Sequence, residues 1–172
     1  MKEAIRKLLL PAVAAAGLFA GAFTAQAETV LHRGNGAEPE TLDPQKSTGV
    51  PEANIQYELF EGLTTYSPDG KVVPGVAEKW EISDDGKTYT FHLRDSKWSD
   101  GSPVTAGDFV YTLRRLVDPA TASDYAYIID DIANATDIRN GKEKDLTKLG
   151  AEAVDDHTLK ITLAHSTPYF LG

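Results

Sequence analysis

Hydrophobic and polar residues alternate along residues 79–94 with the period of two that a half-buried β-strand requires. The apolar positions of this stretch are Trp80, Ile82, Tyr89, Phe91 and Leu93. The run 83–86 between its two arms reads Ser-Asp-Asp-Gly, in which aspartate can bond its own backbone and glycine accepts a positive φ. The pattern therefore predicts a β-hairpin with one face of each arm turned toward a core.

A helical period replaces this alternation in residues 105–118. The apolar positions at helical spacing are Phe109, Leu113 and Leu116. Thr105 stands at the N-cap position, and Asp108 three residues later makes a short version of the capping box. Asp118-Pro119 ends the predicted helix, because a residue before proline avoids the α region.

Shorter patterns predict the remaining elements. A strand is expected at residues 29–33, and Pro51 begins a helix whose core residues are Ile55, Leu59, Phe60 and Leu63. A second amphipathic helix, ended by Asn140-Gly141, carries Ile128, Ile129, Ile132, Ala135 and Ile138. Residues 142–148 are expected to form an exposed loop. A second hairpin turns at residues 154–157 and continues with alternating Leu159, Ile161 and Leu163.

The first 27 residues have the three parts of a secretory signal peptide. Basic residues at positions 2, 6 and 7 form a positive start, and an uncharged apolar run follows at residues 8–23. Ala25-Gln26-Ala27 offers a small-x-small cleavage site, so we expect the mature chain to begin at Glu28. A transmembrane anchor is the alternative, but this run of 16 residues is shorter than the ~20 that a bilayer core needs.

Composition narrows the compartment and the class of ligand. The chain has no cysteine, which excludes a disulfide framework, a thiolate metal site and a lipid-bearing cysteine. Removing the leader's three basic and one acidic residues from the totals of 17 and 26 leaves 14 and 25, a formal charge of −11. Phosphates are bound by clustered Lys and Arg, so this balance argues against nucleic acid. We expect a free periplasmic protein that is not membrane-embedded.

Residue types that carry catalytic or metal chemistry show no organised pattern. The four histidines, at positions 32, 92, 157 and 165, are scattered over predicted strands and turns without a ligand pair at i, i+4. The sequence contains neither a Gly-x-Ser-x-Gly motif nor a phosphate-binding glycine loop. Asp84-Asp85 and Asp155-Asp156 lie in predicted turns, which account for them. We expect no enzyme, no cofactor and no metal site.

Several long motifs give the chain a resemblance to a known family. They are AEKW at residues 77–80, DDGKTYTFHLR at 84–94 and KWSDGSPVTAGDFVY at 97–111, with a Leu-Asp-Pro run at 42–44. These motifs resemble the extracellular solute-binding proteins of family 5, which serve peptide ABC importers. The resemblance implies a mixed α/β fold of the periplasmic-binding-protein type II. It also implies capture of oligopeptides and their delivery to an inner-membrane ABC permease.

The same resemblance implies where a ligand would bind. In oligopeptide-binding members, the segment that corresponds to Thr48, Gly49 and Val50 pairs its backbone with the peptide, and a tyrosine in the place of Tyr125 reaches it. Gly49 and Val50 match the family pattern, whereas Thr48 replaces an acidic residue. Main-chain pairing is indifferent to side-chain identity, and Gly49 permits close approach. The alternatives are an ordinary turn before a helix and a half-buried core tyrosine.

The resemblance also organises the chain into three parts. A signal peptide (1–27) precedes the first strand and helix of an incomplete first lobe (28–60), and residues 61–172 form an accessory α+β domain. Family members are several times longer and are expected to be monomers with two hinged lobes, so we expect this chain to be an N-terminal fragment or the product of a truncated gene. Binders of a dipeptide, a murein peptide, a nickel chelate or a sugar stay open within the family. A secreted hydrolase or an isolated structural module stays open outside it.

Overall fold

The computed structural model describes residues 30–171. The predicted signal peptide, residues 1–27, lies outside this range. The chain divides into two compact units, residues 1–34 and residues 35–172. Residues 30–33 of the first unit carry no regular secondary structure, and no described strand pairs with them. The prediction of a strand at 29–33 is therefore wrong for residues 30–33, because a strand needs a hydrogen-bonded neighbour.

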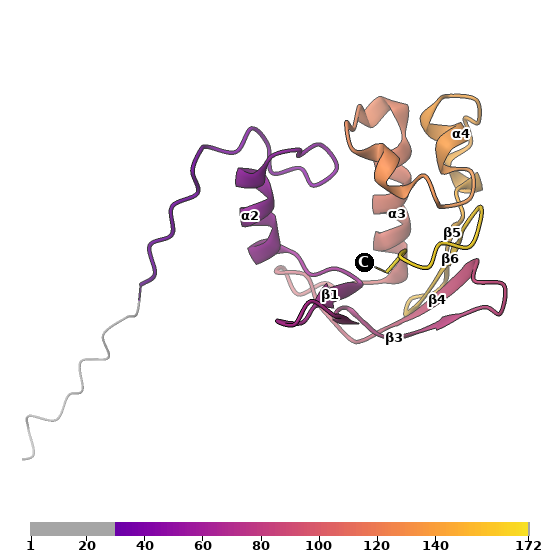
Figure 1. The fold of residues 1–172 in the computed structure, drawn as a ribbon, viewed down its shortest axis with the longest axis horizontal. Helices are drawn as coiled ribbons and strands as arrows, with labels where there is room; N and C mark the ends of the chain where they lie inside the picture. Colours follow the sequence, from indigo (N-terminus) through magenta and orange to yellow (C-terminus); the bar gives the residue numbers. More distant parts are fainter. Residues whose placement is uncertain (1–29, 172) are drawn as a thin grey trace, which may run out of the picture. The chain divides into compact units, whose positions relative to one another are not determined.

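A four-stranded antiparallel sheet lies in the second unit (Figure 1). Its strands, in spatial order, are β3 (Ala77–Ile82), β4 (Thr88–Leu93), β6 (Thr158–Thr162) and β5 (Ala151–Asp155). The pairs β3–β4 and β5–β6 are the two predicted hairpins, which the structure confirms. The two hairpins join where β4 pairs with β6, with Phe91 opposite Leu159.

One face of this sheet carries the core. The buried side chains of the two central strands are Tyr89, Phe91, Leu93, Leu159 and Ile161. Strand β4 therefore alternates as predicted. In β3 the alternation is weaker, since Trp80 is only partly buried and Ile82 is 48% exposed. An edge strand has a neighbour on one side only, which leaves its end uncovered.

Helix α3 (Ala106–Val117) packs against β5 and β6. The backbone N–H of Thr105 donates to Oδ2 of Asp108 at 2.8 Å, which confirms the predicted capping box. The helix ends at Asp118, directly before Pro119, as predicted. Its buried or partly buried apolar residues are Phe109, Val110, Leu113, Leu116 and Val117.

The prediction of one continuous amphipathic helix ending at Asn140-Gly141 is wrong. The segment holds a 3-10 turn, η2 (Ala126–Ile129), and a short helix, α4 (Ala135–Arg139). Between them Asn134 has a φ of 66°, which interrupts helical geometry, and Ile128 is 62% exposed. The buried members of the predicted set are Ile132, Ala135 and Ile138. The apolar spacing therefore predicted the burial of these three residues correctly, but it did not predict the break in the helix.

Two more 3-10 turns lie in the connections, η1 (Pro119–Thr121) and η3 (Leu146–Lys148). The second falls in residues 142–148, which were predicted to be an exposed loop. Leu146 packs partly buried against the core, and the carbonyl oxygen of Lys148 accepts a hydrogen bond from Nδ2 of Asn134 at 2.6 Å, so this otherwise mostly exposed segment is attached to the domain.

Helix α2 (Val50–Leu59) precedes a small sheet of β1 (Thr64–Tyr66) and β2 (Val72–Pro74). It ends before Leu63, because the carbonyls of Gly62 and Leu63 accept hydrogen bonds from residues 75–77. The exposed fractions of Leu59 and Phe60 are 61% and 47%. The prediction that both lie in the core is therefore wrong, since α2 packs on the loop that precedes it.

Within residues 30–171, no helix is both long and apolar enough to cross a bilayer. Nor do these described residues contain a group of three or more His, Asp or Glu side chains placed to hold a metal ion. The predicted domain boundary after residue 60 falls inside the compact unit 35–172 and stays a prediction.

Candidate functional site

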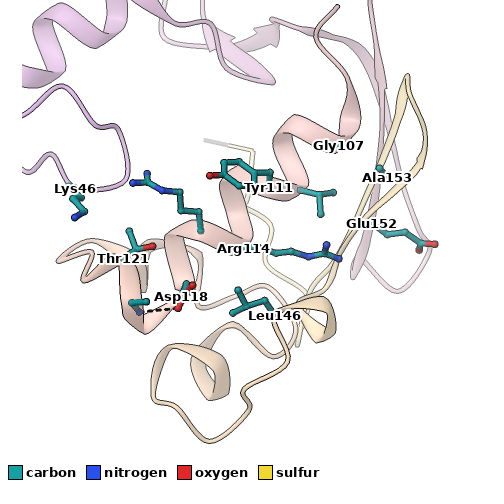
Figure 2. A pocket seen from close by; sticks show the side chains of 12 residues that line it. Lys46, Gly107, Tyr111, Arg114, Asp118, Thr121, Leu146, Glu152 and Ala153 are labelled. Atoms are coloured by element: carbon teal, nitrogen blue, oxygen red, sulfur yellow. Dashed lines mark hydrogen bonds between the residues drawn. The ribbon is translucent and has the colours of Figure 1, made fainter.

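A cavity of about 770 Å³ lies along helix α3 (Figure 2). The charged side chains that line it are Lys46, Arg114, Arg115, Asp118 and Glu152. In Figure 2, Arg114 extends toward β5, whereas Lys46 lies on the other side of α3. The cationic groups therefore do not converge on one point. Lys46 lines this cavity and belongs to the loop before α2, which also contains two of the candidate ligand residues.

That loop begins with a turn at Asp43. The backbone N–H groups of Lys46 and Ser47 both donate to the carbonyl oxygen of Asp43, at 2.9 and 3.0 Å. The N–H of Gln45 donates to Oδ1 of Asp43 at 3.1 Å. An aspartate that bonds its own following backbone is a recognised turn former, so the predicted turn at Asp43-Pro44 is confirmed. The orientation of Asp43 thus sets the path of the next four residues.

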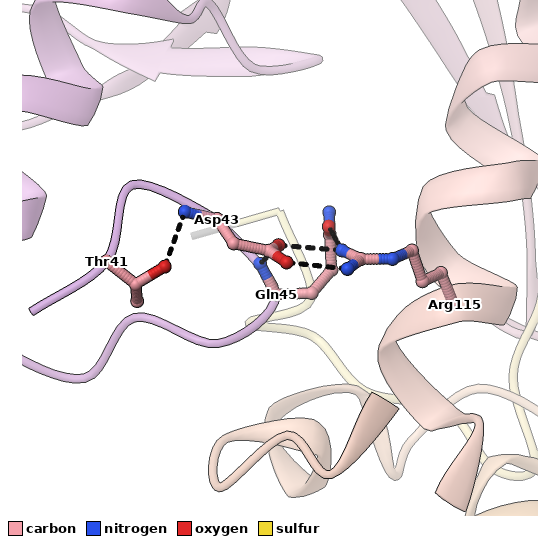
Figure 3. A network of polar contacts seen from close by, with 4 residues as sticks. All are labelled: Thr41, Asp43, Gln45 and Arg115. Atoms are coloured by element: carbon pink, nitrogen blue, oxygen red, sulfur yellow. Dashed lines mark hydrogen bonds and ion pairs between the residues drawn. The ribbon is translucent and has the colours of Figure 1, made fainter. Parts of the chain in front are cut away.

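Arg115 of helix α3 holds this turn with both arms of its guanidinium (Figure 3). Nη1 donates to Oδ1 of Asp43 at 2.6 Å, and Nη2 donates to Oδ2 at 2.5 Å. Nη1 also donates to Oε1 of Gln45. The side chains of Arg115 and Asp43 are 29% and 26% exposed, so the pair is largely shielded from water. A bidentate fork of this kind fixes both distance and orientation.

The Arg115 fork also changes the acidity of Asp43. Hydrogen bonds from the guanidinium stabilise the ionised carboxylate and lower the pKa of Asp43 from 3.8 to about 2. The same contact raises the pKa of Arg115. Both shifts favour the charged forms, so the pair persists throughout the neutral and mildly acidic range.

The loop then reaches the predicted ligand segment. The hydroxyl of Tyr125 donates to the carbonyl oxygen of Thr48 at 3.3 Å. The hydroxyl of Ser47 donates to Oε1 of Gln56 in α2 at 3.1 Å. Thr48 is exposed, and the exposed fraction of Val50 is 72%. The segment therefore lies on the surface while contacts on either side of it hold it in place.

A steric constraint accounts for glycine at position 49. It is the N-cap residue of α2, with a φ of −100° and a ψ of 160°, which other residues adopt equally well. A Cβ atom on Gly49 would lie 2.2 Å from Oε2 of Glu52. Glu52 is only 4% exposed, and its Oε1 accepts a 2.7 Å hydrogen bond from the N–H of Glu40. The Glu52 carboxylate thus occupies the place that a side chain at residue 49 would need.

Tyr125 lies just before η2 and beside a second tyrosine. The rings of Tyr125 and Tyr127 meet edge to face, with centroids 5.9 Å apart and an interplanar angle of 83°. Their exposed fractions are 41% and 55%. Tyr125 and Thr48 are therefore in direct contact, with Gly49 and Val50 adjacent in the chain. Whether these four residues contact a ligand stays a prediction.

Sequence reasoning assigned no role to three residues of this site: Gln45, Glu52 and Arg115. Arg115 follows another arginine on the polar side of a predicted helix, and nothing local pairs it with an aspartate 72 residues away. Glu52 had a local signal, since an acidic residue in the first turn of a helix is favoured near the N-terminus. No sequence pattern predicts that this carboxylate is buried.

Comparison with known proteins defines the class. The family model for bacterial extracellular solute-binding proteins, family 5 Middle, matches residues 71–172, more than half of the chain. The chain belongs to this family of solute-binding proteins. Its solved structural neighbours are members with the type II periplasmic-binding-protein fold, which confirms the predicted mixed α/β class.

Individual relatives are similar over most of this chain. The periplasmic oligopeptide-binding protein OppA of Escherichia coli is 52% identical over 159 residues, which cover 91% of this chain and 29% of that protein. The periplasmic murein peptide-binding protein MppA of Escherichia coli is 49% identical, covering 78% and 25%. The structure of Haemophilus influenzae OppA in complex with RPPGFSPFR superposes with a TM-score of 0.77 at 51% identity, covering 80% and 27%. The chain therefore spans under a third of these relatives.

Proposed function

We propose that this protein captures oligopeptides and delivers them to an inner-membrane ABC importer. The observation that carries the proposal is the exposed segment of Thr48, Gly49 and Val50, held against Tyr125 in a chain 52% identical to an oligopeptide-binding protein. An extended peptide laid beside this segment would gain affinity from main-chain hydrogen bonds, which every peptide sequence can make. Hydrated surroundings would tolerate varied side chains.

The mechanism proposed for the whole protein includes closure of two hinged lobes around the peptide. The contacts of residues 41–50 supply one preformed wall for this closure, because the Asp43 turn and its Arg115 fork order the backbone before a ligand arrives. A preordered backbone loses less conformational entropy on binding. The second lobe would be formed by residues that correspond to the part of the relatives outside the matched region.

Location and partners form part of the same proposal. The leader at residues 1–27 would direct export and be removed after Ala27, leaving a free periplasmic monomer. Its partners would be the oligopeptide and the permease of an ABC transporter. It would return its ligand chemically unchanged and need no cofactor, which separates it from a secreted hydrolase.

A murein peptide is the second candidate ligand, because a relative named for that ligand is 49% identical to this chain. Both candidates are peptides, so the backbone argument serves either. The two candidates differ in the variety of peptides bound, since a murein peptide binder selects one defined peptide and an oligopeptide binder accepts many sequences.

Native mass spectrometry of the complete gene product, purified without denaturation, tests the proposal. We expect bound peptides of mixed sequence, released intact when the protein is unfolded. A single defined peptide would favour the murein candidate. A single non-peptide solute, or cleavage of added peptides, would contradict the proposal.

A further inference from the structure

The four proposed ligand residues come from two predicted domains. Thr48, Gly49 and Val50 belong to the predicted first-lobe segment 28–60, and Tyr125 belongs to the predicted accessory domain 61–172. The 3.3 Å hydrogen bond between the Tyr125 hydroxyl and the Thr48 carbonyl crosses this boundary. A weak neutral hydrogen bond between partly exposed groups contributes little to holding two chain segments in register. Another contact must fix them.

The Arg115 fork crosses the same boundary. Arg115 lies in the last turn of α3, ten residues before Tyr125, and its partners Asp43 and Gln45 lie a few residues before Thr48. We infer that Arg115 is a positioning residue, which holds the loop of residues 43–50 against α3 so that both halves of the ligand site keep their register. This inference rests on the proposed function for its ligand and on the described contacts for its geometry.

The path from Arg115 to the ligand segment is short and continuous. The guanidinium fixes the Asp43 carboxylate in two places, and the Asp43 backbone carbonyl accepts from Lys46 and Ser47. Ser47 then precedes Thr48. A rotation of Asp43 would therefore change the position of the Thr48 carbonyl. Lysine could supply the charge but not the planar fork, so the geometry requires arginine.

A second ion pair provides a matched control. Arg139 of α4 also binds an aspartate with two hydrogen bonds, from Nε to Oδ1 of Asp130 at 3.0 Å and from Nη2 to Oδ2 at 2.6 Å. Its side chains are 33% and 31% exposed, close to the values for Arg115 and Asp43. Both members of this control pair lie in residues 126–139, and neither bonds the loop 43–50. A general effect of losing an arginine fork should be equal in both places.

Amide hydrogen exchange tests the geometric part without any ligand. In Arg115→Lys we expect the amides of Lys46 and Ser47 to exchange about tenfold faster than in the unchanged protein. In Arg139→Lys they should be unchanged. The amide of Leu93, which donates to His157 within the sheet region at 2.8 Å, reports whether each variant stays folded. Equal exchange of the two loop amides in both variants would overturn the inference.

Peptide affinity tests the functional part. The probe is one oligopeptide with several residue types. We expect Arg115→Lys to raise its dissociation constant about tenfold and Arg139→Lys to leave that constant within about twofold of the unchanged protein. If the unchanged protein binds no peptide, the proposed function fails while the exchange result still decides the positioning role. If peptide binds and both variants bind it equally, the positioning role fails alone. Should Arg115→Lys not fold, Asp43→Asn leaves the guanidinium one acceptor oxygen in place of two, and unchanged loop exchange in that variant would contradict the inference.

Discussion

The hydroxyl of Tyr125 and the carbonyl oxygen of Thr48 meet at 3.3 Å although the two residues are 77 positions apart. This contact brings a side chain from after α3 to the backbone just before α2. The adjacent residue Val50 is 72% exposed, so the contact lies at the surface. The Tyr125 ring is also in contact with Tyr127, so the hydroxyl and the ring of this side chain have separate partners.

Removing the Tyr125 hydroxyl therefore distinguishes the contribution of its hydrogen bond from that of its aromatic ring. We expect Tyr125→Phe to reduce peptide affinity about fivefold, the typical worth of one hydrogen bond. Isothermal titration calorimetry of the complete gene product measures this directly. Tyr127→Phe is the control, because the Tyr127 hydroxyl makes no hydrogen bond to the described residues, and it should leave affinity unchanged. Equal losses in the two variants would show that the hydrogen bond from Tyr125 to Thr48 is not the cause of the effect.

Gly49→Ala is expected to destabilise the start of α2. The new methyl group would meet Oε2 of Glu52, and the displaced carboxylate would lose its bond to the N–H of Glu40. The loss should be about 1 kcal/mol in the free energy of unfolding, measured by urea denaturation.

A double-mutant cycle checks the cause of this loss. In a Glu52→Ala background the collision with residue 49 is removed, so adding Gly49→Ala should cost much less than it does alone. An undiminished cost would show that the collision with Glu52 is not what destabilises Gly49→Ala.

The capping box of α3 offers a prediction independent of any ligand. Asp108→Ala removes the acceptor of the 2.8 Å bond from the Thr105 N–H, and we expect a loss of about 1 kcal/mol in unfolding free energy. Asp124→Ala is the matched control, since Asp124 is exposed and its side chain makes no hydrogen bond or ion pair with the described residues. A loss no larger than in that control would contradict the capping role.

The ion pair of Asp43 predicts a pH dependence. Its folded pKa of about 2 lies below the ordinary 3.8, because Arg115 stabilises the carboxylate. The contribution of the pair to stability is therefore complete above pH about 4 and is lost as the pH falls from there toward about 2. A carboxyl NMR titration should give a midpoint near 2 for Asp43, and Arg115→Gln should move it up toward 3.8. A midpoint near 3.8 in the unchanged protein would show that the fork does not persist in solution.

Local patterns predicted the four-stranded sheet and helix α3 well. Phe91 and Leu159 alternate with polar neighbours in hairpins whose turns both contain Asp, and Thr105 precedes a complete helical stripe. Each of these elements is specified by residues close in the sequence. The helix expected over residues 128–138 was wrong, because apolar spacing cannot report that Asn134 takes a left-handed conformation.

The candidate site could be predicted only in part. Thr48, Gly49, Val50 and Tyr125 came from family resemblance, and the structure places Thr48 in contact with Tyr125. Arg115 could not be paired with Asp43, because a bond across 72 residues leaves no periodic or local trace in a single sequence. The burial of Glu52 beside Gly49 likewise depends on the path of the loop before α2, which sequence alone does not define.

Peptide backbone chemistry provides the most direct test of the central claim that Thr48, Gly49 and Val50 hold a guest by main-chain hydrogen bonds. Calorimetry would compare three ligands for the complete gene product: one peptide, its scrambled sequence, and the same peptide with N-methylated amides. We predict that scrambling changes affinity by less than about tenfold, whereas N-methylation, which removes the N–H donors, weakens it by more than about tenfold. A ligand that tolerates N-methylation but loses its affinity on scrambling would show that side chains, and not the backbone, are recognised.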